Sequence, residues 1–375
     1  MDFQLSEEQQ MVYRTASEIA TEEFSDDAFT WEDAFPYENQ ETLAEQGLLG
    51  IGLPMEYGGG GYSPVEVLIA QEAVGRICPD TAHVLSRSSM GPPRVIAELG
   101  SEHLKEKYLP DVCSGDMVLS VAISEPQAGS DAGSMETSVE REGDDLVLNG
   151  SKMWVTKAEQ CGAFLVYARF PDDNIGAIVV DKDTDGLTLD DGTTNMAGHV
   201  QNELYFDDCV VPEDQVLVHE PEAFKELMIE FNVERCHNAM MCVACGLSAF
   251  DKALEHARQR EQFGQPIGEF QGIEWKLADM AIELESARLL IYRAAANAQE
   301  GSPSRLETSL AKVKANEVGQ FVVDEALQIH GATGYMQGSP LEYMYRWVRG
   351  WRIAGGTVEV QRNGIASELK KKGLD

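Results

Sequence analysis

The spacing of apolar residues divides the 375-residue chain into three zones, with a zone of strands between two helical zones. From Leu5 to about Asp116 the apolar positions follow a helical period, and Leu5-Ser6 with Gln9 has the form of a capping box. The run Ser63–Glu66 predicts a second helix start, because Ser suits the N-cap, Pro the first position and Glu the third. Ser101 predicts a further short helix that ends near Pro110.

From Met117 to about Pro221 the pattern changes to the alternation and short apolar runs that are typical of strands. We interpret Asp145–Val155 as two strands joined by a turn at Asn149-Gly150, because Asn-Gly is a strong hairpin signal. Further strands are predicted at residues 118–123, 164–168, 177–180 and 203–206.

From about Ala223 the helical period returns, and residues 273–298 and 306–330 each carry an apolar stripe. Helices, then strands, then helices disfavour a doubly wound α/β fold, in which the two alternate. We expect a mainly α protein with a central β domain. Its parts are an N-terminal helical domain at residues 1–116, a middle β domain at 117–222 and a C-terminal helical bundle at 223–375.

The charge balance narrows the possible functions. The chain has 64 acidic against 29 basic residues and a net charge of −35, which excludes a nucleic-acid binder that works through a basic surface. An acidic functional face is one explanation, and a halophilic surface adapted to molar salt is the other. We favour the second, because the acidic residues are spread along the whole chain.

The sequence also limits where the protein is expected in the cell and which cofactor motifs it contains. No apolar run reaches the roughly 18 residues of a membrane span, and the acidic start is unlike a signal peptide. Seven scattered cysteines indicate a reducing cytoplasm rather than a disulfide framework. Rossmann and P-loop motifs are absent. Cys242 and Cys245 form a C-x-x-C beside Cys236-His237, but their surroundings are typical of a buried helix, so we expect no metal site.

Several segments carry candidate chemistry. Ser124–Gly133 is a turn of small residues that follows a strand, and its backbone N–H groups could face an anionic ligand, although an ordinary connection is the alternative. Trp154 and Thr156 share one strand face, where a core tryptophan is the alternative. Arg260–Ile267 is a basic, aromatic turn between two helices, and Gln328–Tyr335 ends a helix with glycines. Gly355–Arg362 begins another helix, whose N–H groups suit a polar oxygen.

Together and in this order, these segments resemble the acyl-CoA dehydrogenase family, and the resemblance covers nearly the whole chain. Further matching segments are Leu5–Gln9, Gly47–Ile51, Glu56–Gly59 and Gly150–Trp154. The resemblance implies an N-terminal helical domain, a middle β-barrel-like domain and a C-terminal four-helix bundle. It also implies a homotetramer with FAD at a subunit interface.

The resemblance also implies which residues bind. The FAD contacts would be Val121, Ile123, Ser124, Ser130, Trp154, Thr156, Arg260, Phe263, Gln271, Gln328, Gly331, Ala332, Thr357 and Glu359. The substrate contacts would be Ser130, Asn232, Arg235, Gly355 and Gly356. Ala332 departs from the usual glycine and Val358 from the usual serine, which puts single contacts in doubt rather than the fold.

The implied reaction is the α,β-dehydrogenation of an acyl-CoA thioester, with electrons passed to an electron-transfer flavoprotein. It needs a carboxylate to remove the α-proton. Gly355 occupies the family's usual base position and has no side chain. Glu234, in Phe231–Arg235, matches the base of isovaleryl-CoA dehydrogenase within the family, and we expect it to be the catalytic base. The nearest competitor is Glu359.

The substrate and the electron acceptor stay open at this point. The small residues at Ala354–Gly356 favour a short acyl group, branched at C3, of fatty acid or branched-chain amino acid degradation. Arg87 could instead bind a terminal carboxylate, or it could be a structural residue. Two alternative functions are a non-catalytic acyl-CoA or flavin binder that has lost its base, and an oxygen-using oxidase on the same fold.

Overall fold

A computed structural model describes residues 4–32, 34–143, 145–298 and 302–374. They form two compact units. The helical unit comprises Met1–Trp31, Pro64–His83 and Asn232–Asp375, and the sheet unit comprises Glu32–Ser63 and Val84–Phe231. Helices α4 (Pro79–Met90) and α7 (Ala223–Gln259) each have residues in both units.

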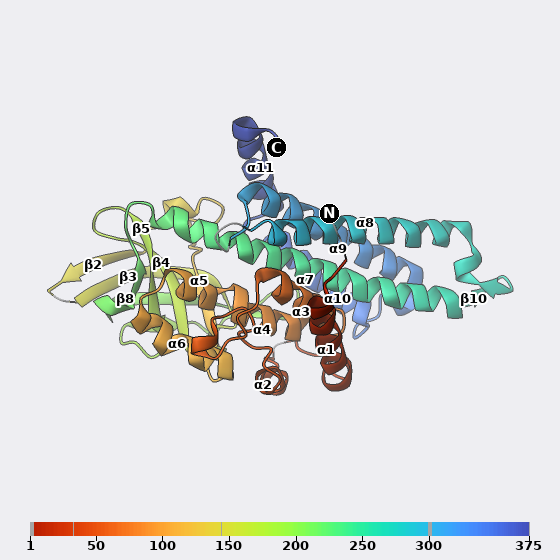
Figure 1. The fold of residues 1–375 in the computed structure, drawn as a ribbon, viewed down its shortest axis with the longest axis horizontal. Helices are drawn as coiled ribbons and strands as arrows, with labels where there is room; N and C mark the ends of the chain where they lie inside the picture. The colour runs from red at the N-terminus through yellow and green to blue at the C-terminus, as the bar shows by residue number, and fades with distance from the viewer. Residues whose placement is uncertain (1–3, 33, 144, 299–301, 375) are drawn as a thin grey trace. The chain divides into compact units, whose positions relative to one another are not determined.

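The helical unit is built from long helices (Figure 1). Apart from its part of α7, they are α1 (Glu7–Glu23), α3 (Pro64–Gly75), α8 (Gln271–Ala296), α9 (Arg305–His330), α10 (Pro340–Trp351) and α11 (Val358–Lys372). Ser6 forms the predicted capping box with Gln9 at the start of α1. The expected stripe of α8 is confirmed in part, since Met280, Leu284, Ala287 and Ile291 are at most 2% exposed.

Small residues let α7, α8 and α9 approach one another closely. A Cβ on Gly246 of α7 would lie 3.0 Å from Leu284 of α8, and a Cβ on Gly319 of α9 would lie 2.8 Å from the Cys242 carbonyl oxygen of α7. The contact with the Cys242 backbone leaves no room for a side chain, and the contact with Leu284 could be relieved only by movement of that side chain. The small-residue run around Cys242 is therefore a helix-crossing surface.

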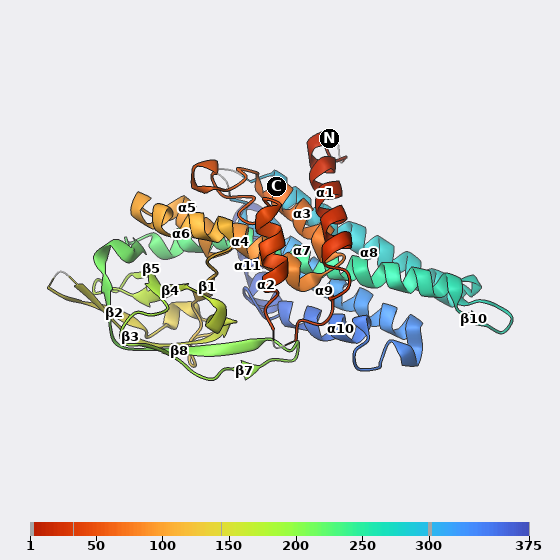
Figure 2. The ribbon, with the colours of Figure 1, turned by 90° about the horizontal axis from the view of Figure 1, so that it is seen from below.

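The sheet unit contains nine strands in one mixed sheet (Figure 2). They are β1 (Leu119–Ala122), β2 (Ser138–Glu142), β3 (Asp145–Thr156), β4 (Ala163–Arg169), β5 (Ile175–Asp181), β6 (Leu187–Leu189), β7 (Thr193–Thr194), β8 (Val200–Pro212) and β9 (Val216–Val218). The order is β6-β8-β3-β2-β4-β5-β9, with β1 pairing parallel to β4 and β7 pairing with β8. Helices α2 (Tyr37–Glu45), α5 (Pro92–Leu99) and α6 (Glu102–Ser114) complete the unit.

The middle of this sheet is buried on both faces. Along β4, Leu165 and Tyr167 pack into a cluster that also contains residues of α5 and α6, whereas Phe164 and Val166 pack into a second cluster. All four are at most 1% exposed. Strand β1 pairs with this buried strand, so its C-terminal end has a firm support.

Two sequence predictions about this unit are wrong. Asn149-Gly150 is not a hairpin turn, because β3 runs unbroken from Asp145 to Thr156 and pairs with β8 on one side. Gly150 instead lies at a register irregularity with φ 138°, where a Cβ would come within 2.6 Å of the Thr137 hydroxyl. Helix α6 also continues past Pro110 to Ser114, and buried Val112 anchors its last turn.

Among the described residues, no helix combines the length and apolarity needed to cross a bilayer.

Candidate flavin and substrate site

The end of strand β1 presents unused hydrogen-bonding groups. Ile123 and Ser124 follow the strand and are half-buried. The Ser124 carbonyl accepts a bond from the Met153 N–H at 2.9 Å. Within the described part of the chain, neither the Ser124 N–H nor its hydroxyl has a partner. Both donors are therefore available to a ligand. Val121, which lies in β1 three residues before Ser124, is half-buried, and Ser130 is exposed.

A buried ion pair holds this turn in place. The Lys152 ammonium contacts the Glu125 carboxylate at 2.5 Å, and their side chains are 0% and 2% exposed. Lys152 also donates to the Ile123 carbonyl oxygen at 3.2 Å. Burial opposes ionisation of Glu125, but the Glu136 N–H and the Lys152 ammonium outweigh it and hold the pKa of Glu125 below its usual value. The turn is thus fixed from beneath by charge-assisted bonds.

Trp154 is not a core tryptophan. Its side chain is 59% exposed, and its backbone has φ 62°, a left-handed conformation that is unusual for a bulky residue. It lies at a second irregularity in the β3–β8 pairing. Thr156 is half-buried two residues on and donates to Gln201 Oε1 at 3.0 Å. A strained, exposed indole on an otherwise well-paired strand indicates a functional surface.

The far end of the helical unit gathers a second group of predicted residues. Arg260 and Phe263 lie in a short hairpin of β10 (Glu261–Gln262) and β11 (Gln265–Pro266) between α7 and α8, and Phe263 is 95% exposed. Stacking of His256 on His330 at 4.2 Å brings the ends of α7 and α9 together. The other predicted residues exposed there are Gln271, Gln328, Gly331 and Ala332.

Arg260 is one of several exposed arginines whose charge has no acidic neighbour in contact among the described residues. Among the described residues it contacts no carboxylate, although the chain holds 64 acidic residues. An exposed guanidinium beside an exposed phenyl ring suits a phosphate-bearing ligand or a partner chain.

The loop before α11 is the third part of the predicted site. Gly355 and Gly356 adopt left-handed conformations, with φ 66° and 86°. The N–H of Gly355 has no partner within the described chain. Thr357 caps α11 by accepting a bond from the Val360 N–H at 3.2 Å. A Cβ at Gly355 would meet only Asn238 and Lys312, each at 3.6 Å, so the space beside the loop is open.

The two candidate bases differ in their surroundings. Glu234 lies on α7 with its side chain 28% exposed, and its Oε1 is 4.0 Å from His237 Nε2. The charges of both Glu234 and Glu359 raise the pKa of buried Lys312, whose Nζ bonds the Gly356 carbonyl, so both carboxylates lie on the side of the helical unit that holds the glycine loop. Glu359 is exposed, and its own N–H and the Thr357 hydroxyl lower its pKa. Glu359 is therefore the weaker base of the two.

The structure places the two polar neighbours of Glu234 in the protein interior. Asn232 is 4% exposed, and its amide donates to the Pro303 carbonyl at 3.0 Å. Arg235 is half-buried and donates to Asn232 Oδ1 at 2.6 Å. Both residues support the start of α9, and their contact with substrate stays a prediction.

Arg87 is a second guanidinium that contacts no carboxylate among the described residues. It is half-buried in α4 of the sheet unit. Its Nη2 donates to the Leu119 carbonyl oxygen at 2.8 Å and contacts Cys161 Sγ at 3.6 Å. Leu119 begins strand β1, so Arg87 is attached to the strand that leads to Ile123 and Ser124.

Six of the seven cysteines are buried, and Cys113 is half-buried. Cys242 and Cys245 are fully buried in α7, and burial raises the pKa of Cys242 to about 12. Asn316 Nδ2 contacts the Cys242 sulfur at 3.1 Å. No cluster of metal-ligating side chains occurs among the residues that the structure describes.

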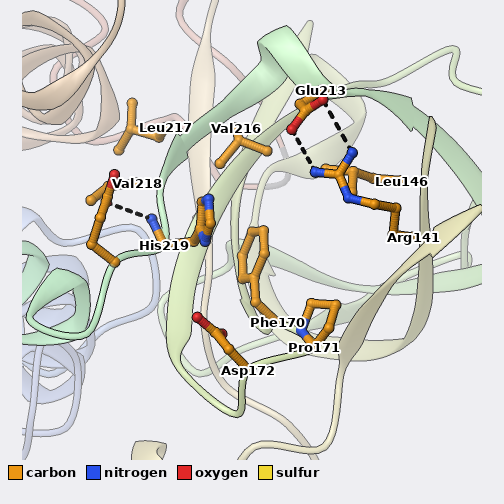
Figure 3. Close-up of a pocket in the computed structure, with 11 residues that line it drawn as sticks. Arg141, Leu146, Phe170, Pro171, Asp172, Glu213, Val216, Leu217, Val218 and His219 are labelled. Carbon is orange, nitrogen blue, oxygen red and sulfur yellow. Dashed lines mark hydrogen bonds and ion pairs between the residues drawn. The ribbon is translucent and has the colours of Figure 1, made fainter. Parts of the chain in front are cut away.

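A hollow of about 430 Å³ lies elsewhere in the sheet unit (Figure 3). The Phe170 ring stacks on His219 at 4.9 Å, and Arg141 pairs with Glu213 at 2.5 Å. None of the predicted site residues lines this hollow, so it belongs to a different part of the surface.

Sequence reasoning missed the interior groups that hold these segments. Lys152 with Glu125, and Lys312 with Asn316, are buried polar residues beneath the predicted site. A signal for the second pair was present, because Ser309, Lys312 and Asn316 are polar residues spaced three and four positions apart, which places them on one face of a helix. Its partners lie on other helices and cannot be read from local spacing.

Comparison with known proteins agrees with this arrangement. The acyl-CoA dehydrogenase N-terminal, middle and C-terminal domains match residues 6–116, 120–209 and 224–370. The 3-sulfinopropanoyl-CoA desulfinase of Paraburkholderia xenovorans (strain LB400) is 36% identical over 378 residues, which cover 98% of this chain and 97% of that protein.

Solved structures show the same fold. Butyryl-CoA dehydrogenase from Megasphaera elsdenii superposes with a TM-score of 0.93 at 30% identity, covering 99% of this chain and 100% of that one. Glutaryl-coenzyme A dehydrogenase in its glutaryl-CoA complex gives a TM-score of 0.93 at 29% identity, covering 100% and 98%.

The residues present fit the cofactor of this family. The unpartnered Ser124 donors and the exposed Trp154 suit a flavin ring, and Arg260 suits a diphosphate. The fold is the one that the resemblance implied: a helical N-terminal part, a middle sheet and a helical C-terminal part. The chain therefore belongs to the acyl-CoA dehydrogenase family of FAD-dependent oxidoreductases.

Proposed function

We propose that the protein converts an acyl-CoA thioester to the trans-2-enoyl-CoA and that Glu234 removes the α-proton. One observation carries this proposal: Gly355 has no side chain, while a partly exposed carboxylate lies near its loop from α7. Glu359 is already engaged by its own helix N-terminus. A partly exposed carboxylate beside the substrate's α-carbon can accept and release a proton.

The chain's other groups would align and polarise the substrate. Bound FAD supplies the hydride acceptor for the β-hydrogen. The Gly355 N–H is available to hold the thioester oxygen, where negative charge develops as the α-proton leaves. Because both glycines are left-handed, the loop can come close to a ligand without a Cβ in the way.

The variant Glu234→Gln tests the base. It should keep FAD bound, while bleaching of the flavin by acyl-CoA slows by about 10²–10⁴-fold, the range of general acid–base catalysis. Glu359→Gln is the matched control and should bleach at close to the normal rate. Loss of activity in the control alone would move the base to Glu359. Normal activity in both variants would leave neither as the base, and no bleaching of the unaltered protein would favour a non-catalytic binder.

A second candidate concerns the acyl group, which we propose ends in an anion. The observation that favours it is Arg87, a half-buried guanidinium with no carboxylate partner among the described residues. Two of the similar proteins are named for thioesters with a terminal anion, glutaryl-CoA and 3-sulfinopropanoyl-CoA. A short acyl group branched at C3 is the competing expectation.

A substrate panel separates these possibilities. We would compare butyryl-CoA, isovaleryl-CoA, glutaryl-CoA and 3-sulfinopropanoyl-CoA by flavin bleaching, and follow sulfite release with the last. If Arg87 binds the anion, Arg87→Met should raise KM for the anionic substrates by roughly 10–100-fold and leave butyryl-CoA little changed, since a charge-assisted bond is worth about 1.5–3 kcal/mol. Equal losses on all four substrates would show that Arg87 is structural.

The electron acceptor and the assembly belong to the same proposal. We propose an electron-transfer flavoprotein as acceptor and a homotetramer as the working assembly. Release of hydrogen peroxide in step with turnover would instead identify an oxidase. Mass measured by light scattering tests the tetramer.

We also propose that the acidic surface is suited to high salt. At about 1 M ionic strength the Debye length falls to roughly 3 Å, which weakens self-repulsion at a net charge of −35. Unchanged stability from dilute buffer to molar salt would contradict this.

A further inference from the structure

The helical unit contains a buried chain of hydrogen bonds that ends at the glycine loop. Lys312 Nζ donates to Asn316 Oδ1 at 3.1 Å. Asn316 Nδ2 donates to Asn238 Oδ1 at 2.9 Å. Asn238 Nδ2 donates to the Ala354 carbonyl oxygen at 3.3 Å. Lys312 and Asn316 are 0% exposed and Asn238 is 1% exposed, so water does not compete for these bonds.

Lys312 sets the donor and acceptor direction of all three hydrogen bonds. An ammonium can only donate, so Asn316 must turn its oxygen toward Lys312 and its NH₂ toward Asn238. Asn238 then accepts through its oxygen, and its own NH₂ is left to face Ala354. All three bonds therefore point the same way, from the charged group to the backbone. Aligned bonds of this kind polarise one another.

The bond from Asn238 acts on the peptide group that joins Ala354 to Gly355. Ala354 contributes the carbonyl and Gly355 the N–H of the same trans peptide, so the two groups point in opposite directions. With its carbonyl directed at Asn238, the peptide turns the Gly355 N–H away from the interior. A donor on the carbonyl draws electron density from the amide and makes this N–H a stronger donor.

Neighbouring bonds fix the rest of the loop. Lys312 Nζ also donates to the carbonyl oxygens of Trp351 at 3.2 Å and Gly356 at 3.0 Å. Gln361 Nε2 donates to the carbonyl oxygen of Gly355 at 3.3 Å. The carbonyls of this loop are thus held by buried side chains, and its peptides cannot easily rotate.

We infer that Lys312, Asn316 and Asn238 are positioning residues that aim and strengthen the Gly355 N–H as the donor to the substrate's thioester oxygen. The inference rests on the proposed function, which places that oxygen at Gly355. It adds three interior residues to the site, none of which touches the substrate. Asn238 acts on the reaction through the Ala354–Gly355 peptide, and Lys312 acts both through Asn238 and through its own bonds to the carbonyls of Trp351 and Gly356.

Two substitutions of Asn238 test the inference. Asn238→Leu removes the donor without adding charge, and Asn238→Asp keeps the shape and the bond from Asn316 but cannot donate when ionised. An effect shared by both variants comes from the lost donor. Lys312→Met removes the charged end of the hydrogen-bonded chain and, with it, the bonds to the carbonyls of Trp351 and Gly356. Ser248→Ala, a buried change at 3% exposure on the same helix as Asn238, is the control.

The decisive readout is the infrared carbonyl stretch of a ¹³C-labelled enoyl-CoA thioester bound to the FAD-loaded protein. Binding should lower its frequency in the unaltered protein and in Ser248→Ala. Both Asn238 variants should lose much of this shift, and Lys312→Met should lose part of it. We expect kcat to fall about tenfold with little change in KM, less than the roughly 10²–10³-fold loss of a direct oxyanion donor.

An unchanged carbonyl frequency in the variants, with FAD still bound, would overturn the inference. If the unaltered protein binds FAD but is bleached by no acyl-CoA, the proposed function fails and the inference with it.

Discussion

Replacement of Lys312 by methionine gives a prediction whose size follows from the structure. Burial lowers the pKa of Lys312 from 10.5 to about 8, with smaller effects from Cys242, Arg235, Glu234 and Glu359. That difference corresponds to about 3 kcal/mol between the folded and the unfolded chain. Methionine has a similar length and no charge, so Lys312→Met removes this term.

Whether Lys312 stabilises the protein more at high or at low pH follows from how many protons the folded and the unfolded chain bind. Between pH 8 and 10.5 the unfolded chain keeps the Lys312 proton while the folded chain loses it, so the contribution of Lys312 to stability rises with pH. It is fully present above about pH 10.5 and is lost as the pH falls through about 8. The free energy of unfolding of the unaltered protein minus that of Lys312→Met should therefore rise by about 3 kcal/mol between pH 7 and 10.5.

Denaturant unfolding at four or five pH values measures this difference directly. Other groups that titrate in the range cancel, because both proteins contain them. Lys225→Met is the control. Glu222 raises the pKa of the exposed Lys225, so its difference should stay small and, if anything, fall with pH. A flat or falling difference for Lys312→Met would refute the burial argument.

Three further predictions concern the site segments. Gly355→Ala should cost roughly 1–2 kcal/mol, because its φ is 66° while the nearest atoms are 3.6 Å away. Gly356→Ala should cost more, because the new Cβ would lie 2.7 Å from Gln361 Nε2, and this buried side chain is held by a bond from Ser309. Urea unfolding compares the two variants, and equal costs would contradict the contact argument. Lys152→Met should lower the free energy of unfolding by about 3–5 kcal/mol, because it leaves Glu125 charged and buried, and a loss below about 1 kcal/mol in urea unfolding would contradict this. Trp154→Gly should stabilise the apoprotein against urea, because glycine adopts the left-handed backbone conformation of residue 154 without strain. The same variant should bind FAD more weakly in a fluorescence titration, and tighter binding would contradict a role of Trp154 at the flavin.

Local signals in the sequence predicted much of the fold. Ser6 and Gln9 form the expected cap, and the stripe on α8 is buried from Met280 onward. The Asn149-Gly150 prediction failed because a local turn signal competed with strand pairing across the sheet. There Gly150 is needed for close approach to Thr137 and not for a turn. Tertiary contact outweighed local preference at that point.

The sequence predicted less of the candidate site than of the fold. The family resemblance marked Phe263 and Trp154, but the sequence left a core tryptophan as the alternative at Trp154 and could not show that its backbone is strained. The Lys312–Asn316–Asn238 chain connects two helices to a loop more than 100 residues away from Asn238, and only the fold brings these groups together. Whether Glu234 is the base also depends on this packing, since one carboxylate among 64 has no distinguishing mark in composition.

Arg87 and Arg260, which contact no carboxylate among the described residues, make the electrostatic potential that an anionic ligand meets depend on its distance from the protein. Far from the surface, a ligand with phosphate groups meets only the repulsion of a strongly negative chain. Within a few ångströms of Arg87 or Arg260 it meets an uncompensated positive charge. Dissolved salt suppresses the first effect much more than the second, because screening acts on separations beyond the Debye length. Salt would thus weaken the long-range repulsion that slows the approach of an anionic ligand, while the short-range attraction to Arg87 or Arg260 keeps most of its strength.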